Sequence, residues 1–79
     1  MTITKAVAYA VINVITENGK DVSQLSEFAV NPESFRVRVY SIISGKVRRI
    51  SVNTIHEFCC VTGYTLEEFF ARKEFDDLE

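Results

Sequence analysis

The sequence predicts an all-α protein, a compact bundle of five helices, and three observations favour this fold class. Apolar residues recur at spacings of three and four, which is the period of a helix that buries one face. Residues that cap helix N-termini, such as Asp21, Asn31 and Thr65, stand in front of several of these stretches. Glycines follow three of the stretches, where a helix can end in a left-handed turn: Gly19, Gly45 and Gly63.

Size and composition indicate one folded domain. The chain has 79 residues, of which 47% are hydrophobic and 25% charged, with three glycines and one proline. This composition is typical of a globular protein rather than a disordered one. A domain this small has a marginal core, so a partner subunit or a ligand could add to its stability. We divide the chain into a domain over residues 1–73 and an acidic tail over residues 74–79.

The sequence predicts no membrane segment and no structural disulfide. From these two expectations we predict a cytoplasmic location. The apolar run near the N-terminus is interrupted at Asn13 and is far shorter than the ~20 residues of a membrane-spanning helix. Cys59 and Cys60 are adjacent, which is poor geometry for a disulfide, and no other cysteine could pair with them. Reduced thiols are therefore expected.

The first helix is expected over residues 2–18, with a core stripe of Val7, Val11, Val14 and Ile15. Its many β-branched residues leave a strand as the alternative, although strict alternation is absent. A second stripe on this helix is either a dimer surface or a set of isolated exposed side chains: Lys5, Ala8, Tyr9, Ile12 and Thr16.

A short second helix is expected to begin at Asp21. Gln24 follows three positions later, so the two side chains can form a capping box in which each accepts a hydrogen bond from the other's backbone N–H. Val22, Leu25 and either Phe28 or Ala29 are its inward positions.

The third helix is expected over residues 31–44. Asn31 can cap it and Pro32 suits its first position, although Ser34 is an alternative cap. Apolar residues fall on one face, namely Phe35, Val39, Ile42 and Ile43. Other side chains are expected to point elsewhere, mostly toward solvent: Arg36, Arg38, Tyr40 and Ser41. Such a helix either presents hydrogen-bond donors to a ligand or is an ordinary amphipathic helix with a solvated polar face.

Charge is distributed unevenly along the chain. The formal net charge is −2, but residues 67–79 hold six acidic and two basic side chains, so the other residues carry +2. Five cations lie close together in the sequence: Arg36, Arg38, Lys46, Arg48 and Arg49. A polyanion responds to the local field rather than to the net charge, so this segment could contact phosphates. The alternative for residues 46–49 is a solvated loop.

Two further helices are expected after this loop. One runs from Ser51 or Val52 to Val61, with an inward face of Val52, Ile55, Phe58 and Cys59. The other begins at Thr65, which forms a capping box with Glu68 and is followed by Leu66, Phe69 and Phe70 facing the core. Beyond Lys73 the acidic tail is expected to fray, although Phe75 and Leu78 could still pack.

No pattern predicts an enzyme, a cofactor or a metal site. His56 and Cys60 lie four residues apart, but structural zinc takes four ligands and the chain has no other histidine. Cys59 is expected to fill the core. A single histidine leaves no base for a serine or cysteine nucleophile, and the three scattered glycines form no phosphate-binding loop.

Six segments are informative when taken together in their order and spacing: residues 15–20, 22–26, 40–46, 51–55, 58–59 and 63–70. In that order they resemble the lambda-repressor and Cro type of helix-turn-helix domain, as found in small Xre-family regulators of bacteria and phages. The resemblance implies a five-helix bundle in which helices two and three form the DNA-binding unit. It also implies a homodimer that binds double-stranded DNA and regulates transcription as a repressor, with the third helix in the major groove.

By position, the resemblance implies base contacts from the third helix: Ser34, Arg36, Val37, Arg38 and Ser41. It implies contacts to the DNA backbone from residues before, on and after that helix: Ser23, Gln24, Tyr40, Lys46, Arg48 and Arg49.

The chain departs from the family pattern in the turn between the second and third helices. The segment from Leu25 to Gly45 is about three residues longer, and Val30-Asn31 replaces the usual turn glycine. Val22 also occupies a position where the family often has glutamine. The alternative function is therefore a protein-interaction module on the same fold, such as an anti-repressor or an antitoxin-like partner, that uses the apolar face of the first helix.

Overall fold

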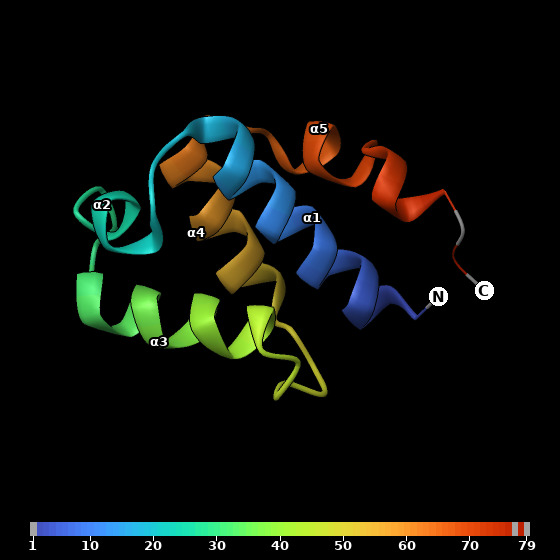
Figure 1. The fold of residues 1–79 in the computed structure, drawn as a ribbon, viewed down its shortest axis with the longest axis horizontal. Coiled ribbons are helices and arrows are strands. Elements are labelled where there is room, and N and C mark those ends of the chain that lie inside the picture. The colour runs from blue at the N-terminus through green and yellow to red at the C-terminus, as the bar shows by residue number, and fades with distance from the viewer. Residues whose placement is uncertain (1, 77, 79) are drawn as a thin grey trace.

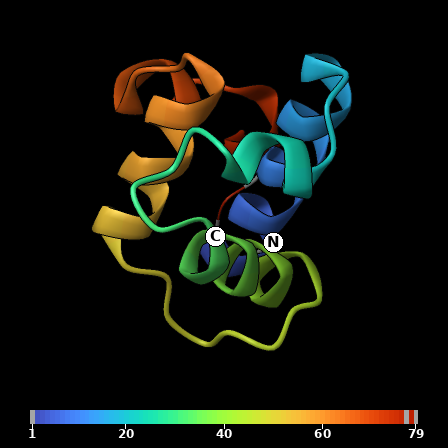
Figure 2. The same cartoon turned by 90° about the vertical axis from the view of Figure 1, so that its left-hand side faces the viewer.

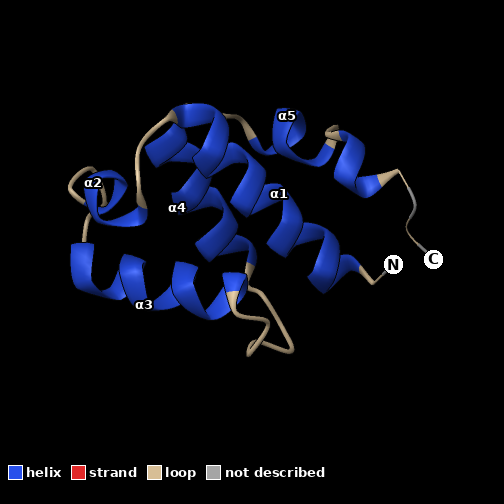
Figure 3. Ribbon diagram, viewed as in Figure 1, coloured by secondary structure: helices blue, strands red, loops and turns tan. Residues whose placement is uncertain are grey.

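The computed structural model describes residues 2–76 and 78, and helices are the only regular secondary structure in that part of the chain (Figures 1 and 3). The elements are α1 (Ile3–Asn18), α2 (Val22–Ser26), α3 (Pro32–Ile43), α4 (Val52–Thr62), α5 (Leu66–Phe70) and the 3₁₀ turn η1 (Lys73–Phe75). The predicted all-α class with five α-helices is confirmed.

All five α-helices begin at a residue whose side chain accepts a hydrogen bond from the backbone N–H three positions on. The capping boxes predicted for Asp21 and Thr65 are both present. Asn31 caps α3, because its Oδ1 accepts from the amide of Ser34 at 3.1 Å. The alternative of Ser34 as the cap was therefore wrong. These caps fix the helix starts through local chemistry alone.

α3 ends at the predicted glycine. Gly45 has φ of +73°, a left-handed conformation that favours glycine, and its amide donates to the carbonyl of Ile42 at 3.1 Å. The amide of Lys46 then donates to the carbonyl of Ser41 at 3.2 Å. The chain turns sharply here and leaves α3 as a loop over residues 44–51.

The helices surround one core. α1 packs against α3, α4 and η1. In Figure 1 α3 runs along the lower edge of the molecule, while α5 and η1 lie along the upper edge. Figure 2 shows from a second direction that α3 and the loop after it form the lower edge. One side of α3 is therefore turned away from the rest of the protein.

Three buried phenylalanines join α3, α4 and α5. Phe35 stacks on Phe58 with ring centroids 6.4 Å apart, and Phe58 meets Phe69 edge-on at 6.1 Å. Aromatic pairs at such separations add to the free energy gained from burying their area. Val39 and Ile42 complete the buried face of α3, as predicted.

Two side chains that were predicted to face the core, Val52 and Phe70, are exposed. Of the two alternatives for the inward position after Leu25, Ala29 packs on the core. Phe28 is 65% exposed because α2 ends at Ser26, and the Nζ of Lys20 lies 5.1 Å from its ring. Val52 is 63% exposed because it begins α4, one turn before the buried Ile55. Phe70 is partly exposed and packs on the rings of Phe69 and Phe75.

The chain remains packed beyond Lys73, the predicted end of the domain. Phe75 packs against the core and Glu74 is held by polar contacts, whereas Leu78 is exposed. The tail expected over residues 74–79 therefore begins with residues that belong to the folded body. Asp77 and Glu79 lie outside the described residues.

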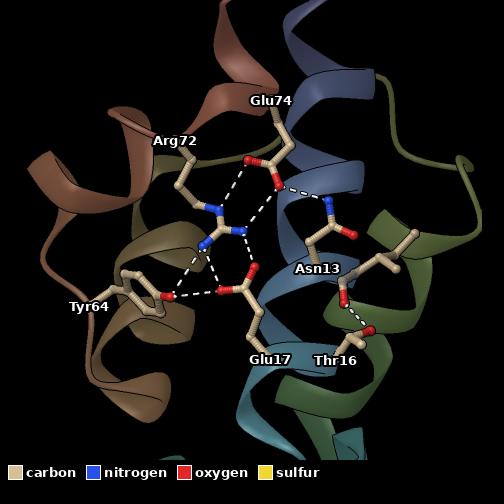
Figure 4. Close-up of polar contacts among 7 residues, drawn as sticks. Asn13, Thr16, Glu17, Tyr64, Arg72 and Glu74 are labelled. Carbon is tan, nitrogen blue, oxygen red and sulfur yellow. Dashed lines mark hydrogen bonds and ion pairs between the residues drawn. The ribbon is translucent and has the colours of Figure 1, made fainter.

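Arg72 holds this C-terminal segment to α1 through a cluster of polar side chains, shown in Figure 4 and called the Arg72 cluster. The guanidinium donates to Glu17 at 2.6 Å and to Glu74 at 3.1 Å, and the Arg72 side chain is only 12% exposed. Asn13 donates its amide N–H to Glu74 at 2.7 Å, and the Tyr64 hydroxyl donates to Glu17 at 3.2 Å. The cluster thus joins α1, η1 and the turn before α5.

The Arg72 cluster shifts the pKa values of its members. Burial alone would raise the pKa of Glu74, but hydrogen bonds from Arg72 and Asn13 outweigh it and lower that pKa to about 2. The hydrogen bond from Arg72 also lowers the pKa of Glu17. In turn, the two carboxylates raise the pKa of Arg72.

No helix among residues 2–76 combines the length and the apolar character that crossing a membrane would require.

We expect Glu74 to make folding sensitive to acid. Its pKa is lower in the folded state than in the unfolded chain, where it is near 4.5, so its stabilising contribution is complete above about pH 5. That contribution is lost as the pH falls from about 4.5 toward 2. Glu74→Gln should lower the free energy of unfolding by about 2 kcal/mol at pH 7, and by less at pH 3. Urea titrations at both pH values measure this difference.

Glu27→Gln is the matched control, because Glu27 is exposed and has no side-chain hydrogen bond to another described residue. Its free energy of unfolding should stay within about 0.5 kcal/mol of the unmodified protein. Equal effects of the two substitutions would contradict a special role for Glu74.

Candidate nucleic-acid interface

The side of α3 opposite the core carries a ridge formed by Ser34, Val37 and Ser41, which we call the outer ridge. These positions are separated by three and four residues, so they line up along one face of the helix. Val37 stands out from it with 61% of its surface exposed, whereas the two serines are half-buried. The exposure of Val37 is compatible with the base contact that the resemblance implies, and that contact stays a prediction.

Arg38 lies beside the outer ridge and lines two hollows. The smaller hollow, of about 320 Å³, lies at the start of α3 and is lined by Asn31, Glu33, Ser34, Val37 and Arg38. The larger, of about 430 Å³, lies between α3, the loop after it and the start of α4; we call it the α3–α4 groove. Arg38 is exposed, so its guanidinium is available to a ligand on this face.

The α3–α4 groove mixes apolar and hydrogen-bonding side chains. Its walls are formed by Val37, Arg38, Ser41, Ile42, Val47, Arg49, Ile50, Ser51, Asn53 and Thr54. Sequence reasoning missed Asn53 and Thr54 as members of this surface. Their position two and three residues after Ser51, the capping residue of α4, was the available signal, since that cap adjoins the basic loop. The hydroxyls of Ser51 and Thr54 lie 2.8 Å apart and satisfy each other.

The loop over residues 44–51 is held in place by its apolar residues. Val47 and Ile50 pack on the core, and the hydroxyl of Thr4 in α1 donates to the carbonyl of Arg48 at 3.4 Å. The cations that flank Val47 and precede Ile50 are exposed: Lys46, Arg48 and Arg49. The spacing of apolar and basic residues therefore turns the positive charges outward.

These cations lie on the opposite side of the molecule from the acidic first turn of α5. α5, which carries Glu67 and Glu68, lies along the edge opposite α3 (Figures 1 and 2). Within residues 2–76, the ion pairs are those of Arg72 with Glu17 and Glu74, so they use none of the cations of α3 or its loop. Glu33 is the acidic residue in the first turn of α3.

Arg36 is directed into the protein. Its Nη1 donates to the hydroxyl of Ser26 at 3.1 Å, and Ser26, which is fully buried, donates in turn to the carbonyl of Ser23 at 2.7 Å. The expectation that Arg36 points mostly to solvent is therefore corrected. Arg36 lies three residues before the buried Val39, which places it on the flank of α3 that faces α2.

The remaining predicted contact residues are exposed but lie outside the two hollows. Ser23 and Gln24 are on α2, where the Gln24 carbonyl oxygen accepts from the backbone of Asp21 at 3.0 Å. Tyr40 is two residues after Arg38, which places it on the other flank of α3. The structure thus gathers Ser34, Val37, Arg38, Ser41 and Arg49 around the hollows, with Lys46 and Arg48 on the adjoining loop.

The second stripe of α1 is another exposed surface; we call it the α1 stripe, and it consists of Lys5, Ala8, Tyr9, Ile12 and Thr16. Tyr9 and Ile12 are exposed as the sequence suggested, and they border a hollow of about 180 Å³ between α1 and the end of α3. Lys5, Ala8, Ile43, Ser44 and Gly45 complete its lining. The two exposed apolar side chains are therefore neighbours of one concave surface.

His56 and Cys60 face each other on α4, with the sulfur 3.7 Å from Nε2. Within the described part of the chain, no third histidine, cysteine or carboxylate joins them to form a group suited to a metal ion. Cys59 fills the core as predicted; its burial, with a smaller effect from Cys60, raises the pKa of its thiol to about 11.

We expect Arg36 and Arg38 to differ in their effect on stability. Arg36→Ala removes the donor to the buried Ser26 hydroxyl and should lower the free energy of unfolding by roughly 1–2 kcal/mol. Arg38→Ala removes an exposed side chain of the same type on the same helix, and should change it by less than about 0.5 kcal/mol. Urea unfolding of both variants measures the difference, and equal losses would contradict it.

Comparisons of this chain with protein-family models, with curated proteins and with solved structures find no match.

Proposed function

We propose that this protein is a sequence-specific regulator of transcription, a repressor, that binds double-stranded DNA with α3 in the major groove. The observation that carries this proposal is the exposed cationic face formed by α3 and the loop after it. Arg38, Lys46, Arg48 and Arg49 are exposed there and take part in no ion pair within the described chain. Contacts of this kind with phosphates supply nearly all of the non-specific affinity for DNA and a large share of the specific affinity.

The shape of α3 supports the same function. The major groove of B-DNA is about 12 Å wide, which matches the ~10–12 Å diameter of a helix with its side chains. Ser34 and Ser41 on the outer ridge are short, so the α3 backbone could approach the base edges closely. Each hydroxyl can donate or accept one hydrogen bond with a base or a phosphate.

In this function, different residues would contact the bases and the phosphates. Arg38 lies on α3 itself and is suited to the acceptor edge of guanine, while Lys46, Arg48 and Arg49 would neutralise phosphates. Arg36 would act as a positioning residue that fixes α3 against α2 through Ser26. Ser23, Gln24 and Tyr40 flank α3 and are proposed as further contacts to the DNA backbone.

The resemblance to the lambda-repressor and Cro type of domain supports a homodimer on a two-fold site. In that arrangement two copies of α3 enter successive major grooves about 34 Å apart. We propose that the α1 stripe takes part in dimer formation, because Tyr9 and Ile12 expose apolar area beside a hollow.

A protein-interaction module is the second candidate function, and the same stripe favours it. Exposed apolar side chains beside a concave surface are suited to a partner protein as well as to a second copy. The two functions differ in what the cationic face does, because a module that binds only protein has no need of Arg48 and Arg49.

We expect affinity for duplex DNA to fall steeply with salt. Lys46, Arg48 and Arg49 would neutralise about three phosphates per protomer, which gives a slope near −2.7 per protomer in log K against log salt, or about a 40-fold loss between 50 and 200 mM. Fluorescence anisotropy with a duplex selected from a random pool measures this slope. No binding at 50 mM salt would refute the proposed function.

Substitutions should separate base contacts from phosphate contacts. Arg48→Ala or Arg49→Ala should weaken binding to all sequences alike and lower the salt slope by about one, whereas Arg38→Ala should reduce the preference for the selected site over random DNA. Lys73→Ala is the control, because Lys73 lies in η1 at the opposite edge of the molecule (Figure 1). An equal loss in Lys73→Ala would show that net charge alone governs binding.

We expect a concentration-dependent dimer that Ile12→Lys weakens. Burying Tyr9 and Ile12 against a second copy would make a lysine at position 12 unfavourable. Sedimentation velocity at tens of micromolar measures the change, with Ile3→Lys as a control on an exposed apolar residue outside the hollow. A monomer in the unmodified protein, together with one tight protein partner and no DNA binding, would favour the interaction module.

A further inference from the structure

Val37 is an exposed apolar side chain on the outer face of α3, next to hydrogen-bonding side chains. It is 61% exposed, lines both hollows of α3, and lies between Ser34 and Ser41 on the outer ridge. Its neighbour Arg38 is charged and lines the same two hollows. Val37 does not serve the core, because Phe35, Val39 and Ile42 form the buried face of α3.

We infer that Val37 is a specificity-determining residue that recognises a pyrimidine carrying a 5-methyl group, thymine in ordinary DNA. This inference rests on the proposed function, because it concerns the base that α3 meets in the major groove. The C5 methyl of thymine is the apolar feature that base pairs present there; the other groups at the base edges are hydrogen-bond donors and acceptors. The valine methyls, which cannot form hydrogen bonds, would pack on that methyl.

The position of Val37 relative to Arg38 also constrains the sequence of the site. Adjacent residues of a helix differ by 100° in direction and 1.5 Å in height, so both side chains reach bases within one or two steps of each other. With Arg38 at a guanine edge, the thymine that meets Val37 should lie next to that guanine or one base pair away.

The other exposed valines have different surroundings. Val52 is exposed to a similar extent, at 63%, but it lines a hollow with Ile3, Phe70 and other mostly apolar side chains and no cation. Val30 is exposed in the turn before α3 and lines none of the hollows of the outer ridge. Among these three residues, Val37 is the one that combines an exposed apolar surface with cations suited to DNA.

The test uses the full chain and a duplex selected from a random pool. Each thymine of the selected site is replaced in turn by deoxyuridine, which lacks only the methyl group, and affinities are measured by anisotropy. We expect one thymine per half-site at which the replacement weakens binding about 3- to 5-fold, the effect of one buried methyl group. Replacing that thymine and its paired adenine by 5-methylcytosine and guanine should also preserve affinity better than unmethylated cytosine and guanine do.

Val37→Ser should abolish the difference between thymine and deoxyuridine at that position. Val52→Ser is the matched control, with the same substitution at the same degree of exposure, and it should keep the difference. Far-ultraviolet circular dichroism melts confirm that both variants fold. Selected DNA that binds without any thymine effect, or an effect that persists in Val37→Ser, would overturn the inference and leave the proposed function standing. Absence of DNA binding by the unmodified protein would instead refute the proposed function itself.

Discussion

The packing of the inner face of α3 determines what its outer face presents. Phe35 stacks on Phe58, which meets Phe69, so one line of rings runs from α3 through α4 to α5. A helix anchored by a ring at one position cannot rotate about its axis without disrupting the stack. The directions of Val37 and Arg38 are therefore set by aromatic contacts on the far side of the helix.

Arginines in this protein serve two different purposes. Arg36 and Arg72 are partly buried and each joins separate segments of the chain, one through a serine hydroxyl and the other through two carboxylates. Arg38, Arg48 and Arg49 are exposed and have no such structural partner among the described residues. The net charge of −2 does not show this division. Six of the eleven acidic residues lie in residues 67–79, whereas the exposed arginines lie on α3 and the loop after it.

Local chemistry made the helices predictable to within about one residue at most ends. Caps such as Asn31 and Thr65 and the glycine at position 45 act on backbone groups a few residues away, so the sequence alone identifies them. Features that depend on distant segments were not predictable. The inward turn of Arg36 requires Ser26 to lie beside it, and Glu74 is ordered by contacts from Asn13, 61 residues earlier. The groove next to Asn53 likewise exists only once α4 meets the loop.

The separation between the Arg72 cluster and the cationic face has an evolutionary consequence. Side chains such as Val37 and Arg49 are exposed and remote from the contacts that hold the helices together, so they can be exchanged at little cost in stability. Recognition could then diversify among descendants of this chain by drift at a few surface positions. Arg36 is excluded from that freedom, because its guanidinium donates to the buried hydroxyl of Ser26 and joins α3 to α2.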